Sequence, residues 1–182
     1  MTAVTDSTPR IAQNEDMHPT DILSQEHRRI EARLDALERE IAAAERGGPF
    51  RRVFFEEALD FFRDFADGLH HAKEENLLFP RMAERGVPVE GGPIGVMLSE
   101  HEQGRAYLRA VRENLDAAER GDRTALRQVF GNAAGYIGLL RAHIQKEDNI
   151  LFRIARMALS PADVAELEER FAAVGVVAEV AR

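Results

Sequence analysis

The sequence predicts an all-α protein: an antiparallel up-down-up-down four-helix bundle followed by a short fifth helix. Three observations predict it. Apolar residues recur at alternating steps of three and four, glycine and proline divide the chain into long segments, and no run of alternating β-branched residues indicates a strand. With 182 residues, of which 45% are hydrophobic and 31% charged, the chain is expected to be globular with a single large core.

The breakers indicate three parts. Residues 1–19 are polar and are expected to form a flexible N-terminal tail, in which His18 is solvated. Residues 20–160 are expected to form the bundle. Residues 161–182 are expected to form a short C-terminal helix packed on or near it.

The first helix is predicted to run to Arg46, where the breakers GGP end it, and either Thr20 or Asp21 can cap its start. Its apolar stripe is continued by a histidine, and the stripe comprises His27, Ile30, Leu34, Leu37 and Ile41. The second helix is predicted from about Pro49 to Arg85, before the breakers GVP. Its stripe comprises Phe55, Ala58, Phe62, Phe65 and Leu69, and His70 lies one residue off it.

The third helix is predicted from Pro93 to about Gly121, and the fourth from about Asp122 to Leu159. Both carry stripes that include a histidine. The third has Ile94, Met97, His101, Gly104, Leu108, Val111 and Leu115; the fourth has Val129, Ala133, Tyr136, Leu140, His143, Glu147, Ile150 and Ile154. Ser160 caps a fifth helix that is expected to fade near Gly175.

Charge and composition exclude several classes of function. The net charge of −8, without any cluster of Lys or Arg, argues against a nucleic-acid partner. No window is apolar enough to span a membrane, and the N-terminus lacks the pattern of a secretory signal. The absence of cysteine excludes disulfides, thiolate metal sites and iron–sulfur clusters, and it fits a cytoplasmic protein. We expect a small-molecule partner, and the oligomeric state stays open.

Two segments of the chain read almost alike. Residues 70–79 are HHAKEENLLF and residues 143–152 are HIQKEDNILF. Upstream of each lies a matching fragment, SQEHRR around His27 and LSEHEQ around His101. The two halves of the bundle therefore look like copies of one helical hairpin.

Counting residues from the connecting turns places the four histidines in one layer. His27 lies 19 residues before the predicted end of its helix and His70 lies 21 residues after the next helix begins; His101 and His143 repeat these numbers. A mismatch of two residues is about 3 Å, which is within side-chain reach. Two glutamates, Glu74 and Glu147, each follow a histidine by four residues and share its helix face.

Imidazoles and carboxylates that converge inside a bundle need cations to balance them. Without thiolates, such a set suits iron, manganese or zinc, and two bridging carboxylates favour a dinuclear iron site. The repeat assigns His27 and His70 to one metal and His101 and His143 to the other. Bridging is assigned to Glu74 and Glu147.

The arrangement His…HxxxE…His…HxxxE resembles the hemerythrin-like (HHE) cation-binding family over about residues 20–160. The segments GPIGVMLSEHEQGR (92–105) and HHAKEENLLFP (70–80) also look like family sequence. The resemblance implies a hemerythrin-like four-helix bundle that holds two iron ions, with zinc or manganese as alternatives. It also implies that this non-haem di-iron centre binds or reacts with O2, peroxide or nitric oxide, or senses iron and oxygen.

The chain departs from the oxygen-carrying hemerythrins at two positions. Their fifth histidine lies four residues after the third-helix ligand, where this chain has Arg105. Their fourth-helix carboxylate would select Asp148, whereas the symmetry of the repeat favours Glu147. With fewer histidines, turnover or sensing is favoured over reversible oxygen carriage.

Other polar residues receive other expectations. His71 lies about 100° around an α-helix from His70, so it is expected around the ligands or at the surface rather than on a metal. Tyr136 is expected in the core, with a role as a donor near the metals as the alternative. Arg105 is expected to pair with a bridging carboxylate or to line an entry path. Three residues are expected on solvated faces: Lys73, Glu75 and Lys146.

Two functions follow. The first is a redox-active di-iron protein of an oxidative-stress or oxygen and iron response, including a catalase-like reaction. The second is a metal-dependent regulatory or iron-binding module without turnover. Whether the protein is an enzyme stays open at this point.

Overall fold

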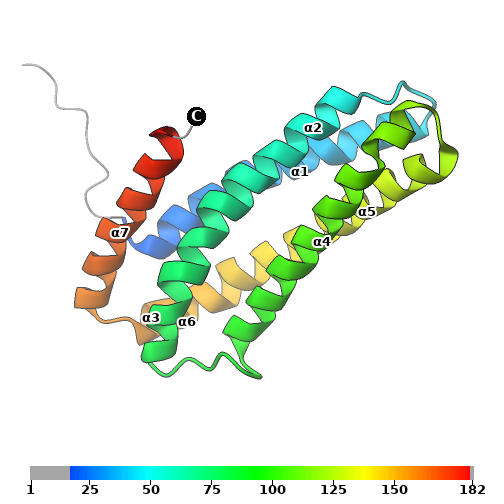
Figure 1. Ribbon diagram of the computed structural model, residues 1–182. Helices are drawn as coiled ribbons and strands as arrows, with labels where there is room; N and C mark the ends of the chain where they lie inside the picture. The colour runs from blue at the N-terminus through cyan, green and yellow to red at the C-terminus, as the bar shows by residue number, and fades with distance from the viewer. Residues whose placement is uncertain (1–16, 181–182) are drawn as a thin grey trace, which may run out of the picture.

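The computed structural model describes residues 17–180, with side chains described to residue 174. The expectation for residues 1–16 lies outside the described residues. Four long helical arms run side by side, and a fifth helix packs at one end of them (Figure 1). Within the described residues the secondary structure is all helical, which confirms the predicted fold class.

The second and fourth arms are each divided into several helical segments. The elements are α1 (Pro19–Glu45), α2 (Arg52–Phe61), η1 (Phe62–His71), η2 (Glu74–Leu78), α3 (Phe79–Glu84), α4 (Pro93–Glu119), α5 (Arg123–Lys146), η3 (Glu147–Leu151), α6 (Phe152–Ala158) and α7 (Pro161–Val180). The turns after α1 and α4 close on glycines with positive φ, 94° at Gly47 and 86° at Gly121. These glycines are the breakers that the sequence indicated.

Three predicted helix ends differ from the structure. The cap of α1 is His18, whose Nδ1 accepts a hydrogen bond from the backbone N–H of Thr20 at 3.2 Å, so the expectation of a cap at Thr20 or Asp21 is wrong. His18 itself is half-buried. Burial lowers the pKa of His18, as does the nearby Arg156. The second arm begins at Arg52 rather than at Pro49. At the other end of the chain, α7 continues past Gly175 to Val180.

The segments η1, η2 and η3 are π-helical, with more residues in each turn than an α-helix. In the second arm, the buried face of η1 runs through Phe62, Ala66 and His70 in steps of four residues. These steps explain why His70 lies one residue off the predicted stripe and is nevertheless buried. The segments η2 and η3 begin at the equivalent residues Glu74 and Glu147 of the two repeats.

Two apolar clusters fill the bundle, one on each side of the polar layer. The cluster toward the α1–α2 and α4–α5 turns includes Leu34, Phe55, Phe62, Val111, Val129 and Ile137. The cluster toward the other end includes Leu23, Leu78, Met97, Leu151, Leu167 and Phe171. The layer that holds the predicted ligands is therefore enclosed by apolar side chains at both ends.

The helix α7 packs against α1, η1 and η2, all of which belong to the first half of the chain. At its start, Ser160 Oγ accepts a hydrogen bond from the backbone N–H of Asp163, and the Asp163 carboxylate accepts one from the Ser160 N–H at 2.9 Å. Asp163 also forms ion pairs with Arg81 of α3 and with Arg85, the residue directly after α3. Among the described residues, no helix is both long and apolar enough to cross a membrane.

Candidate metal centre

The six residues predicted as metal ligands lie together in one layer between the two apolar clusters. Each is at most 2% exposed. They come from all four arms: His27 from α1, His70 and Glu74 from η1 and η2, His101 from α4, and His143 and Glu147 from α5 and η3.

The donor atoms of this layer form two groups that share one carboxylate. The first group contains His27, His70, Glu74 and Glu147, and the second contains His71, Glu74, His101 and His143. Within each group the ligand atoms lie within 4.8 Å of one another. The two histidine pairs that the repeat assigned to separate metals therefore fall in separate groups.

Both central glutamates face both groups. Glu74 Oε1 lies 3.6 Å from His70 Nε2, and Glu74 Oε2 lies 3.6 Å from His101 Nε2. On the opposite side, Glu147 Oε2 lies 3.1 Å from His27 Nε2 and 3.2 Å from His143 Nε2. A carboxylate in such a position can bridge two cations.

Each of the four predicted histidines has its Nδ1 hydrogen-bonded to a further carboxylate. Asp148 accepts from His27 at 2.8 Å, and Glu75 accepts from His101 at 2.7 Å. The remaining two bonds join His70 to Glu26 at 3.0 Å and His143 to Glu100 at 2.9 Å. A carboxylate on Nδ1 fixes the tautomer and the ring orientation, which leaves the Nε2 lone pair available to a metal.

These four orienting carboxylates lie at equivalent positions of the two repeats. Glu26 and Glu100 directly precede the histidines of α1 and α4, and Glu75 and Asp148 directly follow the two central glutamates. Lys73 and Lys146 occupy equivalent positions and form ion pairs with Glu26 and Glu100 respectively. The repeat thus contains the predicted ligands together with the carboxylates that orient them.

Two expectations about these residues are wrong. Lys73 is 4% exposed rather than solvated, because it reaches inward to Glu26. Glu75 is partly buried against His101 and Arg105 rather than free in solvent. The occurrence of E-H and of H-x-x-K-E-[ED] in both halves was the sequence pattern that could have identified these residues.

Asp148 lies outside the central pair of carboxylates. Besides His27, it accepts a hydrogen bond from Ser24 at 2.9 Å and forms an ion pair with Arg28 near the surface. Glu147 occupies the central position instead. The geometry therefore favours Glu147 over Asp148 as the bridging group.

His71 lies around the predicted ligands, which is the first of its two expected positions. It is 5% exposed, and its ring stacks on that of His101 at 3.7 Å between centroids. The expectation of 100° between His70 and His71 assumed an α-helix. Because η1 is π-helical, adjacent side chains are closer in direction and both face inward.

The buried groups have strongly shifted pKa values. Burial lowers the pKa of His70 to about 4, against the opposing effect of Glu26. For His27, burial is outweighed by hydrogen bonds to Asp148 and Glu147, which raise its pKa to about 9. Burial and the neighbouring Glu147 raise the pKa of Glu74 well above its ordinary value. The pKa of Glu147 lies well below its ordinary value because His143 and His27 outweigh burial.

Arg105 and Tyr136 lie beside the second group. Arg105 pairs with Asp67, Glu75 and Glu102 rather than with a bridging carboxylate. Tyr136 is buried with its ring against Phe62, and burial raises the pKa of its hydroxyl.

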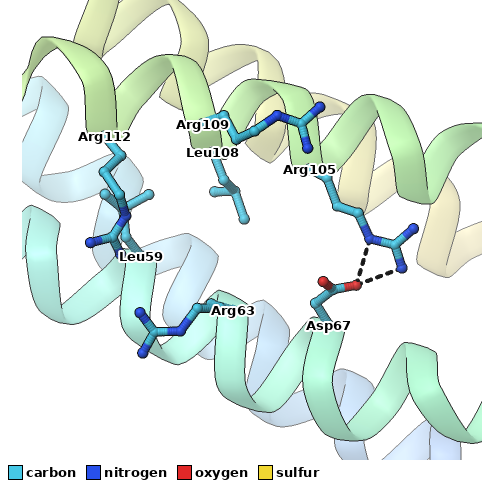
Figure 2. A pocket seen from close by; sticks show the side chains of 7 residues that line it. All are labelled: Leu59, Arg63, Asp67, Arg105, Leu108, Arg109 and Arg112. Atoms are coloured by element: carbon cyan, nitrogen blue, oxygen red, sulfur yellow. Dashed lines mark hydrogen bonds and ion pairs between the residues drawn. The ribbon is translucent and has the colours of Figure 1, made fainter.

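A narrow cavity lies against the second histidine group, and a larger pocket lies outside it. The inner space, about 10 Å³, is lined by residues that include Asp67, His71, His101, Arg105 and Tyr136. The outer pocket, about 220 Å³, is lined by Leu59, Arg63, Asp67, Arg105, Leu108, Arg109 and Arg112. Figure 2 shows Asp67 and Arg105 paired at one end of this pocket, and both cavities share these two residues.

The donor set fits a pair of metal ions. Among the described residues, neither oxygen of Glu74 has a hydrogen-bond partner, and neither have Glu147 Oε1 and His71 Nε2, although all four atoms are buried. Buried polar atoms rarely remain without partners. Imidazole nitrogens and carboxylate oxygens are the donors that iron, manganese and zinc accept.

Comparisons with known proteins agree with this centre. The uncharacterized protein Rv1995 of Mycobacterium tuberculosis is 25% identical over 115 residues, which cover 63% of this chain and 44% of that protein. The iron-sulfur cluster repair protein YtfE of Escherichia coli O157:H7 is 33% identical over 86 residues, which cover 46% of this chain and 39% of that protein. The chain thus spans less than half the length of these curated relatives.

No solved structure matches the chain. The model of the hemerythrin HHE cation-binding domain matches residues 18–155, which include every predicted ligand. By this match and by its helical bundle with a buried layer of histidines and glutamates, the chain belongs to the hemerythrin HHE cation-binding domain family.

Proposed function

We propose that this protein holds two iron ions in the central layer and binds or reacts with O2, peroxide or nitric oxide there. The observation that carries the proposal is the position of the two buried glutamates, each facing histidines of both groups. One ion would be held by His27 and His70, and the other by His101 and His143. Bridging would fall to Glu74 and Glu147.

The number of carboxylates supports a pair of divalent cations. Two carboxylates buried side by side repel each other, and the raised pKa of Glu74 reflects that repulsion and its burial. Cations between them would relieve it. When bound, iron would supply redox chemistry and a position for an exogenous ligand. The protein would orient the imidazoles and exclude bulk water.

The size of the inner cavity favours a very small ligand. Its volume of about 10 Å³ is close to the minimum that admits one water molecule. An organic substrate would not fit, so a ligand of only a few atoms is favoured. The larger pocket outside the Asp67–Arg105 pair (Figure 2) would form the outer part of the entry path.

The comparisons support iron as the metal. The name of the Escherichia coli relative describes repair of iron–sulfur clusters. We propose a role in an oxidative-stress response or in a response to oxygen and iron. We place it in the cytoplasm, where proteins rarely contain disulfides, because the chain has no cysteine.

A second candidate is an iron-responsive module without turnover. It is favoured by the way the layer joins all four arms, because a metal held by all of them would stabilise the bundle directly. Both functions require the same metals. They differ in whether an added oxidant is consumed.

Metal analysis of anaerobically purified protein, followed by absorption spectra during addition of air, peroxide or nitric oxide, tests the proposal. We expect two irons per chain, and a spectrum that changes with each added ligand. Consumption of many equivalents of peroxide indicates turnover, whereas a single stoichiometric change indicates the regulatory module. Protein that binds no iron, with its helices intact by circular dichroism, would refute both.

A further inference from the structure

The pocket outside the Asp67–Arg105 pair is lined mainly by arginines. It has a volume of about 220 Å³ and lies between α4 and the second arm, and four of its seven lining residues are arginines. Figure 2 shows Arg63 and Arg112 at one side of the pocket, Arg105 at the other, and Leu108 pointing into the space between them. The chain as a whole has a net charge of −8, so its overall charge does not predict such a group of cations.

The equivalent groove of the bundle, between α1 and α5, has the opposite arrangement of charge. The repeat aligns the three arginines of α4 that line the pocket with three acidic residues of α1: Glu31, Asp35 and Glu38. Across that groove, Arg141 of α5 forms an ion pair with Asp35 at 2.7 Å and another with Glu38 at 2.7 Å. At the position equivalent to Arg141, the second arm has the uncharged Gly68. The two grooves therefore differ, and only the pocket has arginines on both of its sides.

The charge of Arg109 is not balanced by the protein. Arg109 is exposed, and no residue that the structure describes forms an ion pair with it. Its neighbour Arg112 donates to a single oxygen of Asp60 at 2.9 Å, and Arg63 forms an ion pair with the same oxygen at 2.9 Å. By contrast, Arg105 is held by three carboxylates. Because a guanidinium has five N–H donors, Arg109 and Arg112 both have donors available to one further anion.

The floor of the pocket is apolar. Leu59 is 4% exposed, and Leu108 packs against the same apolar cluster. A second cavity, of about 10 Å³, lies against both leucines on the core side. A floor of this kind suits a hydrocarbon chain better than an inorganic ion. The pocket is smaller than the roughly 300–1,000 Å³ of sites for drug-sized ligands, so the chain would be short.

We propose that this pocket binds a short organic acid, with its carboxylate on Arg109 and Arg112 and its hydrocarbon chain on Leu59 and Leu108. A carboxylate supplies the single negative charge that Arg109 lacks, and guanidinium groups bind carboxylates through paired hydrogen bonds. The proposal goes beyond the proposed function, because none of the lining residues is a predicted metal ligand.

Two substitutions at Arg109 test the proposal. Arg109→Gln removes the charge, and Arg109→Asp reverses it by copying the equivalent residue of α1, Asp35. Both should fold, because Arg109 is exposed, and circular dichroism checks this. Arg127→Gln is the matched control, since Arg127 is an exposed arginine of α5 that bonds to the hydroxyl of Thr124 and forms no ion pair within the described residues.

The measurement is isothermal titration calorimetry of the purified full chain with hexanoate. Hexanamide has nearly the same chain without the charge, and acetate has the charge without the chain. We expect the wild type and the control to bind hexanoate at least about tenfold more tightly than either of these probes. Arg109→Gln should bind hexanoate about tenfold more weakly than the wild type, and Arg109→Asp should show no measurable binding.

Three results would overturn the proposal. The first is a wild type that does not bind hexanoate. The second is equal affinity for hexanoate in the wild type and Arg109→Asp, which would place the carboxylate elsewhere, including on the metals. The third is equal affinity for acetate and hexanoate, which would mean that the apolar floor is not used. None of them affects the proposed function, which metal analysis tests separately.

Discussion

The two halves of the bundle match in the parts that hold metals and differ in the helix that presents them. Each half carries a histidine after a glutamate, and a second histidine followed by a lysine, a bridging glutamate and an acidic residue. Within the described residues, only the first half has a long π-helical segment, η1, around its second histidine, His70. The matching parts provide the same donor residues in both halves, whereas the difference gives each group of donors its own surroundings.

The difference extends to the lysines. Lys73 is almost fully buried and lies 5.6 Å from the ring of Phe171 in α7, whereas the side chain of Lys146 is 37% exposed. The same ion pair with a glutamate is therefore made in two different dielectric environments. Comparing equivalent substitutions in the two halves separates the effect of the ligand pattern from the effect of its surroundings.

The largest expected effect is the loss of a bridging carboxylate. Glu74→Gln and Glu147→Gln should each weaken ferrous iron binding by at least about 100-fold, because a neutral amide replaces the charge that faces both ions. The measurement is an anaerobic binding isotherm. Glu57→Gln, on the exposed face of the same arm, serves as the control. Equal affinity in Glu74→Gln and Glu57→Gln would exclude a bridging role.

A smaller effect is expected from the carboxylates that orient the histidines. Glu75→Gln and Asp148→Asn are equivalent changes in the two halves. Each should weaken the binding of one of the two irons by about 10- to 100-fold. Each variant should affect a different ion, which ⁵⁷Fe Mössbauer spectra can distinguish. If both variants change the same doublet, the assignment of one ion to each histidine pair is wrong.

The lysine pair tests the surroundings without touching a ligand. Lys73→Met removes the partner of a buried glutamate and should lower the free energy of unfolding by about 3 kcal/mol. Lys146→Met removes an exposed partner and should cost less than about 1 kcal/mol. Urea unfolding of the metal-free proteins measures both. Similar costs in the two variants would show that burial does not distinguish the halves.

The smallest effect is expected at α7, which covers the first half. Hydrogen bonds from Arg85, and then from Ser160, hold the pKa of Asp163 below its ordinary value. A carboxyl group whose pKa falls on folding stabilises the folded protein above its unfolded pKa of about 4, and that contribution is lost as the pH falls toward the folded pKa. Asp163→Asn should therefore lower Tm by a few degrees at neutral pH.

The pH dependence provides the control for this variant. The difference in Tm between the wild type and Asp163→Asn should shrink as the pH falls from about 4 toward the lower pKa of the folded protein, since the unfolded chain then binds a proton that the folded carboxyl group does not yet bind. A difference that stays constant down to low pH would mean that Asp163 acts by its shape rather than by its charge.

The sequence predicted the arms and the six central residues because both depend on regular α-helical counting. His27 and His101 lie on regular apolar stripes. Within each hairpin, the distances of the two histidines from the connecting turn differ by only two residues, which is too little to place them in different layers. Most helix ends followed from glycine and proline. The cap at His18 was missed because a histidine side chain seldom takes that role.

The inward position of His71 was not predictable by the same counting. It depends on the π-helical geometry of η1, and the spacing of the apolar residues does not predict a π-helical segment. The orienting roles of Glu26, Glu75 and Asp148 were missed for another reason. Their partners lie on other arms, so helix-face arguments treat these carboxylates as solvated.

The wide turn of η1 has a consequence for how such bundles diverge. A helix that absorbs an extra residue in one wide turn gains a side-chain position without rotating the segments before and after it. Phe65 and Leu78 therefore still face their apolar clusters, while an additional inward group fits between them. A single-residue insertion of this kind alters the chemistry locally and leaves the scaffold unchanged, which makes it an economical evolutionary step between related proteins.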